Sequence, residues 1–227
     1  VDNLQHLLDR NVQWARGKID RDPRFFRRLL AQQSPEYLWI GCSDSRVPAN
    51  EIVDLAPGEL FVHRNVANVV SLPDDNVHAV LEYAIEQLKV KHVMVVGHYG
   101  CGGVQAVLEH RDCGKQTAKW LNNVVDVEVR YRDLIAQEST SPRQAALLCE
   151  LNVLEQTIHV CQSPAVLAAW QAGQSLTVHG WIYHLSNGLL RHLDFTADAP
   201  IVAEELREAS VAAILKTRQA HYARSNS

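Results

Sequence analysis

Four short, continuous apolar runs constrain the fold of this 227-residue chain more than any other feature. Strands of a parallel sheet are buried on both faces, so they are apolar throughout rather than alternating with polar residues. The runs that fit this description lie at 37–40, 60–63, 92–96 and 176–181. We expect a shorter fifth strand at 189–193, after the turn signal Ser186-Asn187-Gly188.

Segments with helical periodicity separate these runs. They lie at 3–20, about 25–30, 74–88, 117–135, from 141, 163–173 and 200–220. Strands that alternate with helices predict an α/β fold with a mostly parallel sheet flanked by helices. The first two helices have little of their own sheet to pack on, so we expect residues 1–34 to form a helical arm that lies across a neighbouring subunit. No repeat or linker divides residues 1–227, which we expect to form a single domain.

The composition is that of an ordinary globular protein, with 47% hydrophobic and 21% charged residues. A net charge of −4 gives no electrostatic reason to expect nucleic acid or an anionic membrane as a partner. No apolar run reaches the roughly 18 residues of a membrane span, and the first residues lack the pattern of an export signal. We therefore expect a cytoplasmic protein. Its five irregularly spaced cysteines favour reduced thiols over disulfides.

Chemically useful side chains gather in the loops that follow the first three strands. In open parallel sheets, ligands bind at the carboxyl ends of the strands. The segments at these ends are Gly41-Cys42-Ser43-Asp44-Ser45-Arg46, His63-Arg64-Asn65-Val66-Ala67-Asn68 and Gly97-His98-Tyr99-Gly100-Cys101-Gly102-Gly103. If the three strands are neighbours in the sheet, these loops meet at one edge.

Cys42, His98 and Cys101 supply two thiolates and an imidazole from these loops. That set of ligands suits zinc, with a fourth position that is open or filled by a carboxylate. His98 and Cys101 are three residues apart in a glycine-rich turn, so both side chains can face one point. The alternative is that the cysteines are merely buried, since free cysteines often behave as small apolar residues. A single His-x-x-Cys pair is weak evidence of a metal site.

Asp44 and Arg46 lie two residues apart in the first loop and could form a bidentate pair. One interpretation is a structural salt bridge within the loop. The other is catalytic: an ionised carboxylate beside the metal can accept the hydrogen of a bound hydroxide and aim its lone pair at an electrophile. Arg46 would keep Asp44 ionised and oriented.

Two other uses of the first loop are excluded. The phosphate cradle of cysteine phosphatases needs five residues between its cysteine and its arginine, whereas three separate Cys42 from Arg46. A thiol redox site is excluded because the chain contains no Cys-x-x-Cys.

Three segments together resemble the signature segments of the β-class carbonic anhydrases. They are CSDSRVP at 42–48, HRNVAN at 63–68 and GHYGCGG at 97–103. PGELFVHRNVAN and CELNVLEQ extend the resemblance, which runs over most of the chain. It implies reversible hydration of carbon dioxide to bicarbonate and a proton, on a sheet of four parallel strands with an antiparallel edge strand. It also implies a homodimer, often paired into a homotetramer, with residues 1–34 at the dimer interface.

The resemblance also assigns roles to the residues of the loops. It implies one Zn²⁺ per subunit, bound by Cys42, His98 and Cys101. Asp44 and Arg46 are then the catalytic pair. Because two thiolates cancel the formal charge of Zn²⁺, we expect the pKa of a bound water to exceed the value of about 7 in three-histidine sites, and activity to rise with pH.

One subgroup of that family is inhibited by bicarbonate at a separate pocket, which is made by a Trp, an Arg and a Tyr from three strands. The corresponding residues here are Trp39, Arg64 and Tyr183. In that subgroup the counterpart of Asp44 can move onto the zinc and displace water, which makes Asp44 a conditional fourth metal ligand. The alternative for Trp39 and Tyr183 is plain core packing.

The substrate pocket is expected to be apolar. Gln33 is a candidate hydrogen-bond donor to bicarbonate, acting across the dimer interface. The full set of candidate pocket residues is Gln33, Val47, Phe61, Val66, Tyr83 and Gly102.

Two rival functions remain open from the sequence. Hydrolases of carbonyl sulfide and carbon disulfide share the fold and the zinc site, behind altered access channels. A non-enzymatic module stabilised by zinc would need a permanent fourth ligand, and Cys113 is the one candidate for it.

Overall fold

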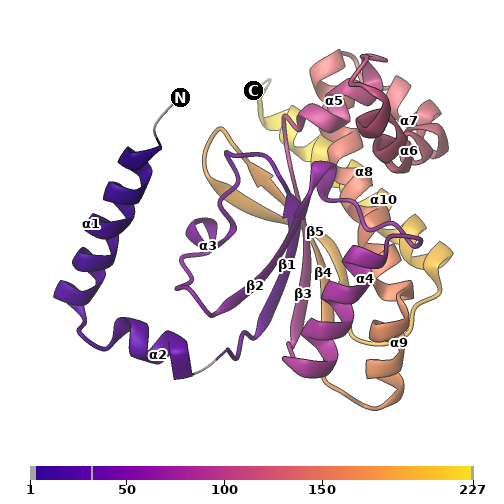
Figure 1. The fold of residues 1–227 in the computed structure, drawn as a ribbon. Coiled ribbons are helices and arrows are strands. Elements are labelled where there is room, and N and C mark those ends of the chain that lie inside the picture. Colours follow the sequence, from indigo (N-terminus) through magenta and orange to yellow (C-terminus); the bar gives the residue numbers. More distant parts are fainter. Residues whose placement is uncertain (1–3, 32, 226–227) are drawn as a thin grey trace.

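The structure is a computed structural model that describes residues 4–31 and 33–225 (Figure 1). Its sheet has five strands in the order β2-β1-β3-β4-β5. The strands are β1 (Tyr37–Cys42), β2 (Leu60–Asn65), β3 (His92–His98), β4 (Thr177–His184) and β5 (Leu189–Ala197). Strands β2, β1, β3 and β4 run parallel, and β5 runs antiparallel to β4. The predicted α/β fold, with four parallel strands and an antiparallel edge strand, is confirmed.

The helices precede, connect and follow these strands. They are α1 (Gln5–Arg21), α2 (Phe25–Ala31), α3 (Ala49–Ile52), α4 (Asp75–Glu82), α5 (Gly102–Leu108), α6 (Lys115–Arg130), α7 (Arg132–Ala136), α8 (Ser141–Gln162), α9 (Pro164–Gln171) and α10 (Ala203–Ser225). Val66–Asn68 forms a 3₁₀ turn, and Tyr83–Gln87 forms a π-helical turn that continues α4. The single helix predicted at 117–135 is in fact two, because the backbone leaves helical dihedrals at Tyr131 (φ −111°, ψ 16°).

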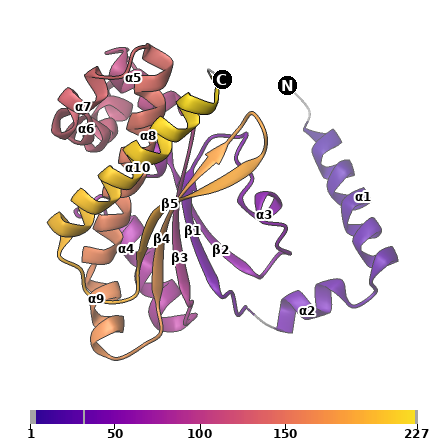
Figure 2. The ribbon, with the colours of Figure 1, turned by 180° about the vertical axis from the view of Figure 1, so that it is seen from behind.

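The larger core lies between the sheet and the helices α4, α8, α9 and α10, which cover one face of the sheet in both views (Figures 1 and 2). Leu38, Ile40 and Cys42 alternate along β1 and point into this core. Helix α8 is buried on every side from Leu147 to Ile158. Polar side chains on such a helix need internal partners, and Glu150, Asn152 and Gln156 of α8 bond the loops that follow β2 and β3.

The opposite face of the sheet carries a smaller apolar cluster under the short helix α3. Its buried members are Trp39, Val47, Ala49, Leu60, Met94 and Val96. Trp181 and Tyr183 of β4 pack against it from the other side of β3.

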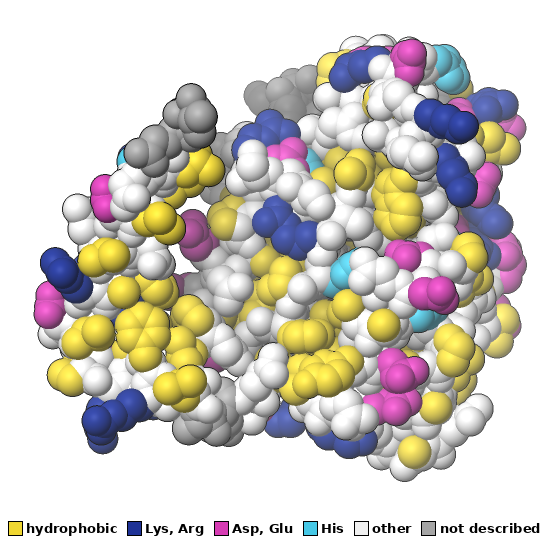
Figure 3. All heavy atoms as spheres, viewed as in Figure 1, with side chains coloured by type: hydrophobic (Ala, Val, Ile, Leu, Met, Phe, Trp, Pro, Cys, Tyr) yellow, Lys and Arg dark blue, Asp and Glu magenta, His cyan; other side chains and the backbone are white. Residues whose placement is uncertain are grey.

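The arm formed by α1 and α2 stands away from the sheet in both views (Figures 1 and 2). No side chain of α1 is buried among the residues that the structure describes. Figure 3 shows apolar side chains gathered on the surface of this arm. The large apolar residues exposed on α1 and just before it are Leu4, Leu7, Leu8, Val12, Trp14 and Ile19. In the described chain, no helix has both the length and the hydropathy of a membrane span.

Candidate metal centre and active site

Two adjacent parallel strands bring the three predicted metal ligands together. Cys42 is the last residue of β1 and His98 the last of β3, and Cys101 follows in the turn before α5. The ligand atoms of the three side chains all lie within 4.8 Å of one another, and all three residues are buried. The two Sγ atoms are 3.9 Å apart. Within the described part of the chain, this is the one group of three or more Cys, His, Asp or Glu that could hold a metal ion.

His98 is oriented to offer one nitrogen to the cluster. Its Nδ1 lies 3.0 Å from the backbone oxygen of Tyr99, and a carbonyl oxygen can only accept, so Nδ1 carries the proton. Nε2 is then the nitrogen with a free lone pair. It is buried and has no hydrogen-bond partner among the described residues, which is the expected state of an atom whose partner is a metal ion.

The thiols of Cys42 and Cys101 are close enough to form a hydrogen bond with each other. A hydrogen bond from Cys101, with further help from His98, lowers the pKa of Cys42 to about 4. The same hydrogen bond, together with burial, raises the pKa of Cys101. A cluster that already holds one sulfur as a thiolate is prepared to bind a soft or borderline metal, which displaces the remaining proton. Two sulfurs and one imidazole nitrogen at these separations fit tetrahedral zinc with one position left over.

The carboxylate of Asp44 stands beside the cluster of Cys42, His98 and Cys101. Its Oδ2 is 3.8 Å from Nε2 of His98. Arg46 holds the carboxylate with three hydrogen bonds: the backbone N–H and Nε donate to Oδ1 at 2.9 Å each, and a terminal guanidinium nitrogen donates to Oδ2 at 2.7 Å. These bonds keep the pKa of Asp44 well below its usual range, so the carboxylate is ionised. Arg46 also donates to the carbonyl of Gly100 at 3.2 Å, which ties the first loop to the His98–Cys101 turn.

The sequence model of the family described as carbonic anhydrase matches residues 37–190, from the start of β1 into β5. The chain belongs to the carbonic anhydrase family. A carbonic anhydrase of Emericella nidulans is 44% identical over 203 residues, which cover 89% of this chain and 87% of that protein. One from Pseudomonas aeruginosa is 30% identical over 84% of this chain and 88% of that protein.

Solved structures place the fold in the β class of carbonic anhydrases. A Coccomyxa β-carbonic anhydrase in complex with acetazolamide superposes with a TM-score of 0.80 at 39% identity, covering 88% of this chain and 90% of that one. A tetrameric β-carbonic anhydrase from Sordaria macrospora gives a TM-score of 0.82 at 35% identity, covering 85% and 98%.

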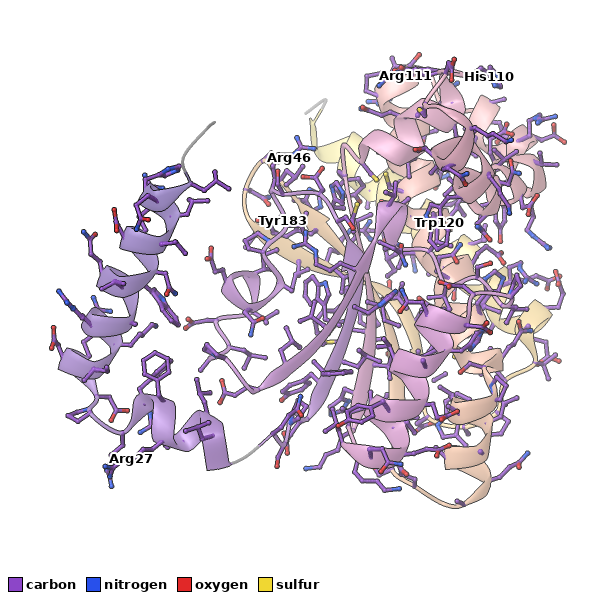
Figure 4. All side chains as sticks on the ribbon, in the orientation of Figure 1. Arg27, Arg46, His110, Arg111, Trp120 and Tyr183 are labelled. Atoms are coloured by element: carbon purple, nitrogen blue, oxygen red, sulfur yellow. The ribbon has the colours of Figure 1, made fainter. Side chains whose placement is uncertain are left out.

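The three residues predicted to form a bicarbonate pocket in this carbonic anhydrase lie on or beside one face of the sheet. Trp39 is fully buried, and its Nε1 has no partner in the described chain. Tyr183 packs against the same cluster, and Figure 4 shows it at the same end of the sheet as Arg46. Arg64 donates to the backbone oxygens of Cys42 at 2.8 Å and Asp44 at 2.5 Å. Its guanidinium therefore also fixes the loop at 42–46, which we call the metal loop.

The candidate pocket residues of this carbonic anhydrase fall into two groups. Val66 and Gly102 lie near the metal cluster: Val66 contacts the position where a Cβ on Gly103 would be, and a Cβ on Gly102 would meet open space. Val47 is buried against Trp39.

Phe61, Tyr83 and Gln33 form the second group. The rings of Phe61 and Tyr83 are 5.9 Å apart, and Phe61 pairs with Leu38, four residues before Cys42 on β1. Gln33 is exposed just before β1. All three therefore lie toward the opposite end of the strands from the metal cluster of their own chain.

The sequence did not reveal how α8 approaches the site. Cys149 of α8 is buried, and the backbone N–H of Cys101 interacts with its thiol, although burial still raises the pKa of Cys149 to about 12. Its sulfur is not part of the metal-ligand cluster. Glu150, the next residue, accepts a hydrogen bond from the Tyr99 hydroxyl. The segment CELNVLEQ at 149–156 was the available signal, because four polar residues interrupt a run that is otherwise apolar.

Proposed function

We propose that this chain catalyses the reversible hydration of carbon dioxide to bicarbonate and a proton. The observation that carries the proposal is the Asp44 carboxylate, held ionised by Arg46 with one oxygen 3.8 Å from the free nitrogen of a Cys-His-Cys cluster. A structural zinc site has no use for an oriented carboxylate at its fourth position. Membership of the carbonic anhydrase family supports the same reaction.

Cys42, His98 and Cys101 would hold one zinc ion per subunit. When bound, zinc supplies a Lewis acid that lowers the pKa of a water molecule and makes it nucleophilic near neutral pH. Asp44 accepts a hydrogen bond from the nucleophile and so fixes the direction of attack on carbon dioxide. Arg46 keeps Asp44 ionised and limits its swing toward the metal cluster. Two anionic sulfurs offset the charge of a divalent metal, so we expect activity to rise with pH.

The test is to follow carbon dioxide hydration by stopped flow, from pH 6.5 to 9, with protein that carries measured zinc. We expect turnover that increases across this range. Hydration no faster than in buffer at every pH, with zinc bound, would refute the proposal. Parallel assays with carbonyl sulfide and carbon disulfide test for the hydrolases that share the fold, and turnover of either compound in place of carbon dioxide would also refute the proposal.

We further propose that bicarbonate inhibits the enzyme at the Trp39–Arg64–Tyr183 face. An unpartnered, buried indole N–H is a donor awaiting an acceptor, and Arg64 adds a positive charge. Because Arg64 also bonds the carbonyls of Cys42 and Asp44, occupation of this face would act directly on the loop that carries Asp44.

Tyr183→Phe is the cleaner test of this regulation, since Arg64→Ala also removes support from the metal loop. We expect Tyr183→Phe to relieve inhibition by added bicarbonate and to keep turnover in its absence. Tyr37→Phe, on β1 and toward the opposite end of the same face, is the control and should keep the inhibition. Unchanged inhibition in Tyr183→Phe would contradict the proposal.

A further inference from the structure

Tyr99 connects the metal ligand His98 to a network of charged side chains behind the site. Its backbone oxygen accepts the hydrogen bond from Nδ1 of His98 at 3.0 Å, so the direction of the imidazole depends on where the Tyr99 peptide lies. Its backbone N–H donates to the backbone oxygen of Tyr183 at 3.0 Å. Gly100, with a φ of 69°, follows immediately, so the chain turns sharply at this point.

Packing alone leaves room for the Tyr99 side chain to move. The ring lines two cavities, one of about 350 Å³ and one of about 300 Å³. It makes an edge contact with His184, at 4.4 Å between ring centroids. Open volume beside an aromatic ring weakens the packing that would otherwise hold it, so hydrogen bonds must fix the phenol.

Glu150 supplies these hydrogen bonds from α8. Its Oε1 accepts hydrogen bonds from the Tyr99 hydroxyl and from the Arg191 guanidinium, the latter at 2.5 Å. Arg191 also donates to the hydroxyl oxygen of Tyr99 at 2.8 Å. Its Oε2 accepts from Arg218 of α10 at 3.4 Å. The Glu150 side chain is 1% exposed. Side chains from α8 and β5 thus bond the phenol of Tyr99, and α10 supports Glu150 from its other oxygen.

A second network of the same composition offers a built-in comparison. Glu155, one and a half turns further along α8, accepts from the Tyr131 hydroxyl at 2.5 Å and from Arg207 at 2.7 Å. Its side chain is also buried, at 4% exposure. Tyr131 lies between α6 and α7, and no hydrogen bond in the described chain joins it to the turn from His98 to Cys101. Each network therefore has a buried glutamate, a tyrosine and an arginine, but only one touches the residue next to His98.

We infer that Glu150 is a positioning residue for the metal centre, acting through Tyr99 to hold the imidazole of His98 in its ligand orientation. This role rests on the zinc site of the proposed function. Buried ion pairs contribute little to stability compared with apolar packing, so stability alone does not account for a carboxylate and two guanidinium groups gathered behind this turn.

Tyr99→Phe and Tyr131→Phe test the inference as a matched pair. Each removes one hydroxyl that donates to a buried glutamate, and each keeps the ring. The zinc dissociation constant is measured by competition with a chelator, and the absorption bands of the Co²⁺-substituted protein report the ligand geometry. We expect Tyr99→Phe to weaken zinc binding about tenfold and to shift the cobalt bands, whereas Tyr131→Phe changes neither by more than about twofold.

Equal zinc affinity in Tyr99→Phe and the parent would overturn the inference. So would an equal loss in both variants, because that result assigns the effect to general loosening of the fold. If Tyr99→Phe does not fold, Glu150→Gln and Glu155→Gln give the same comparison with side-chain shape retained. None of these readouts uses carbon dioxide. A parent protein that binds zinc without hydrating carbon dioxide would therefore refute the proposed function without contradicting this inference.

Discussion

At the scale of single residues, the indole of Trp39 occupies the space beside Gly41. Both residues point to the same face of β1, because they are two apart in a strand. A Cβ on residue 41 would lie 2.2 Å from Nε1 of Trp39, closer than real contacts allow. The glycine before Cys42 is therefore required by its neighbour, and its absent side chain lets a large aromatic residue lie under the metal loop.

Replacement of Gly41 by alanine should destabilise the protein. We expect a loss of about 1–3 kcal/mol in the free energy of unfolding, because the added methyl group forces Trp39 out of its position. Urea unfolding measures the loss. Gly17→Ala is the control: nothing lies within 4 Å of its Cβ, so it should cost nothing. A Gly41→Ala protein as stable as the parent would show that Trp39 moves freely.

The metal cluster could be predicted from the sequence because its signals are local. Cys42 and His98 each end an apolar run, and parallel strands bring their carboxyl ends to one edge. Two sets of hydrogen bonds could not be predicted: those from Arg64 to the backbone of the first loop, and that from Tyr99 to Glu150. They depend on the directions of side chains that are 20 and 51 residues apart from their partners in the sequence.

At the scale of elements, α8 is the helix that organises the carboxyl edge of the sheet. Asn152 donates to the backbone oxygen of Ala67 at 2.9 Å, and Gln156 accepts from the backbone N–H of Val70 at 2.8 Å. Ala67 and Asn68 have positive φ angles of 65° and 47°. Side chains from α8 thus hold a strained loop that follows β2. The Ser141-Pro142 start of α8 was predictable, but its polar contacts were not, because apolar periodicity carries no information about them.

Asn152→Ala should destabilise this loop and the fold. The backbone oxygen of Ala67 would lose its buried donor, at a cost of about 1–3 kcal/mol in the free energy of unfolding. Chemical denaturation measures the cost, and amide hydrogen exchange should accelerate at 66–71. The exposed Asn122 on α6 provides a control substitution, Asn122→Ala, that should leave both measurements unchanged. Equal stability of Asn152→Ala and the parent would show that the loop holds itself.

At the scale of the whole molecule, the arm carries large apolar side chains that are exposed in the described part of the chain. Leu4, Leu8 and Val12 are spaced one helical turn apart and are 59%, 62% and 46% exposed. Because exposed apolar patches mark protein–protein contacts, we propose that this stripe packs on a second copy of the chain. The helical periodicity at 3–20 and 25–30 predicted both helices of the arm, whereas a periodic pattern carries no information about their direction relative to the sheet.

Leu8→Glu should therefore weaken self-association. A charge in the middle of the stripe would be buried against the partner, so sedimentation should show a smaller species than the parent at the same concentration. Arg10→Glu, also on α1 but outside the stripe, should leave the association state unchanged. A Leu8→Glu protein that sediments like the parent would place the interface elsewhere.

The most direct test of the role of Asp44 is the turnover of Asp44→Asn with zinc content measured on the same sample. Asparagine keeps the shape of Asp44 but loses the charge that Arg46 holds and the second acceptor oxygen. We expect one zinc per chain and carbon dioxide hydration reduced about 100-fold or more. Asp54→Asn, a control at an exposed residue between α3 and β2, should keep the parental rate. Full zinc occupancy with parental turnover in Asp44→Asn would contradict the claim that catalysis depends on this carboxylate.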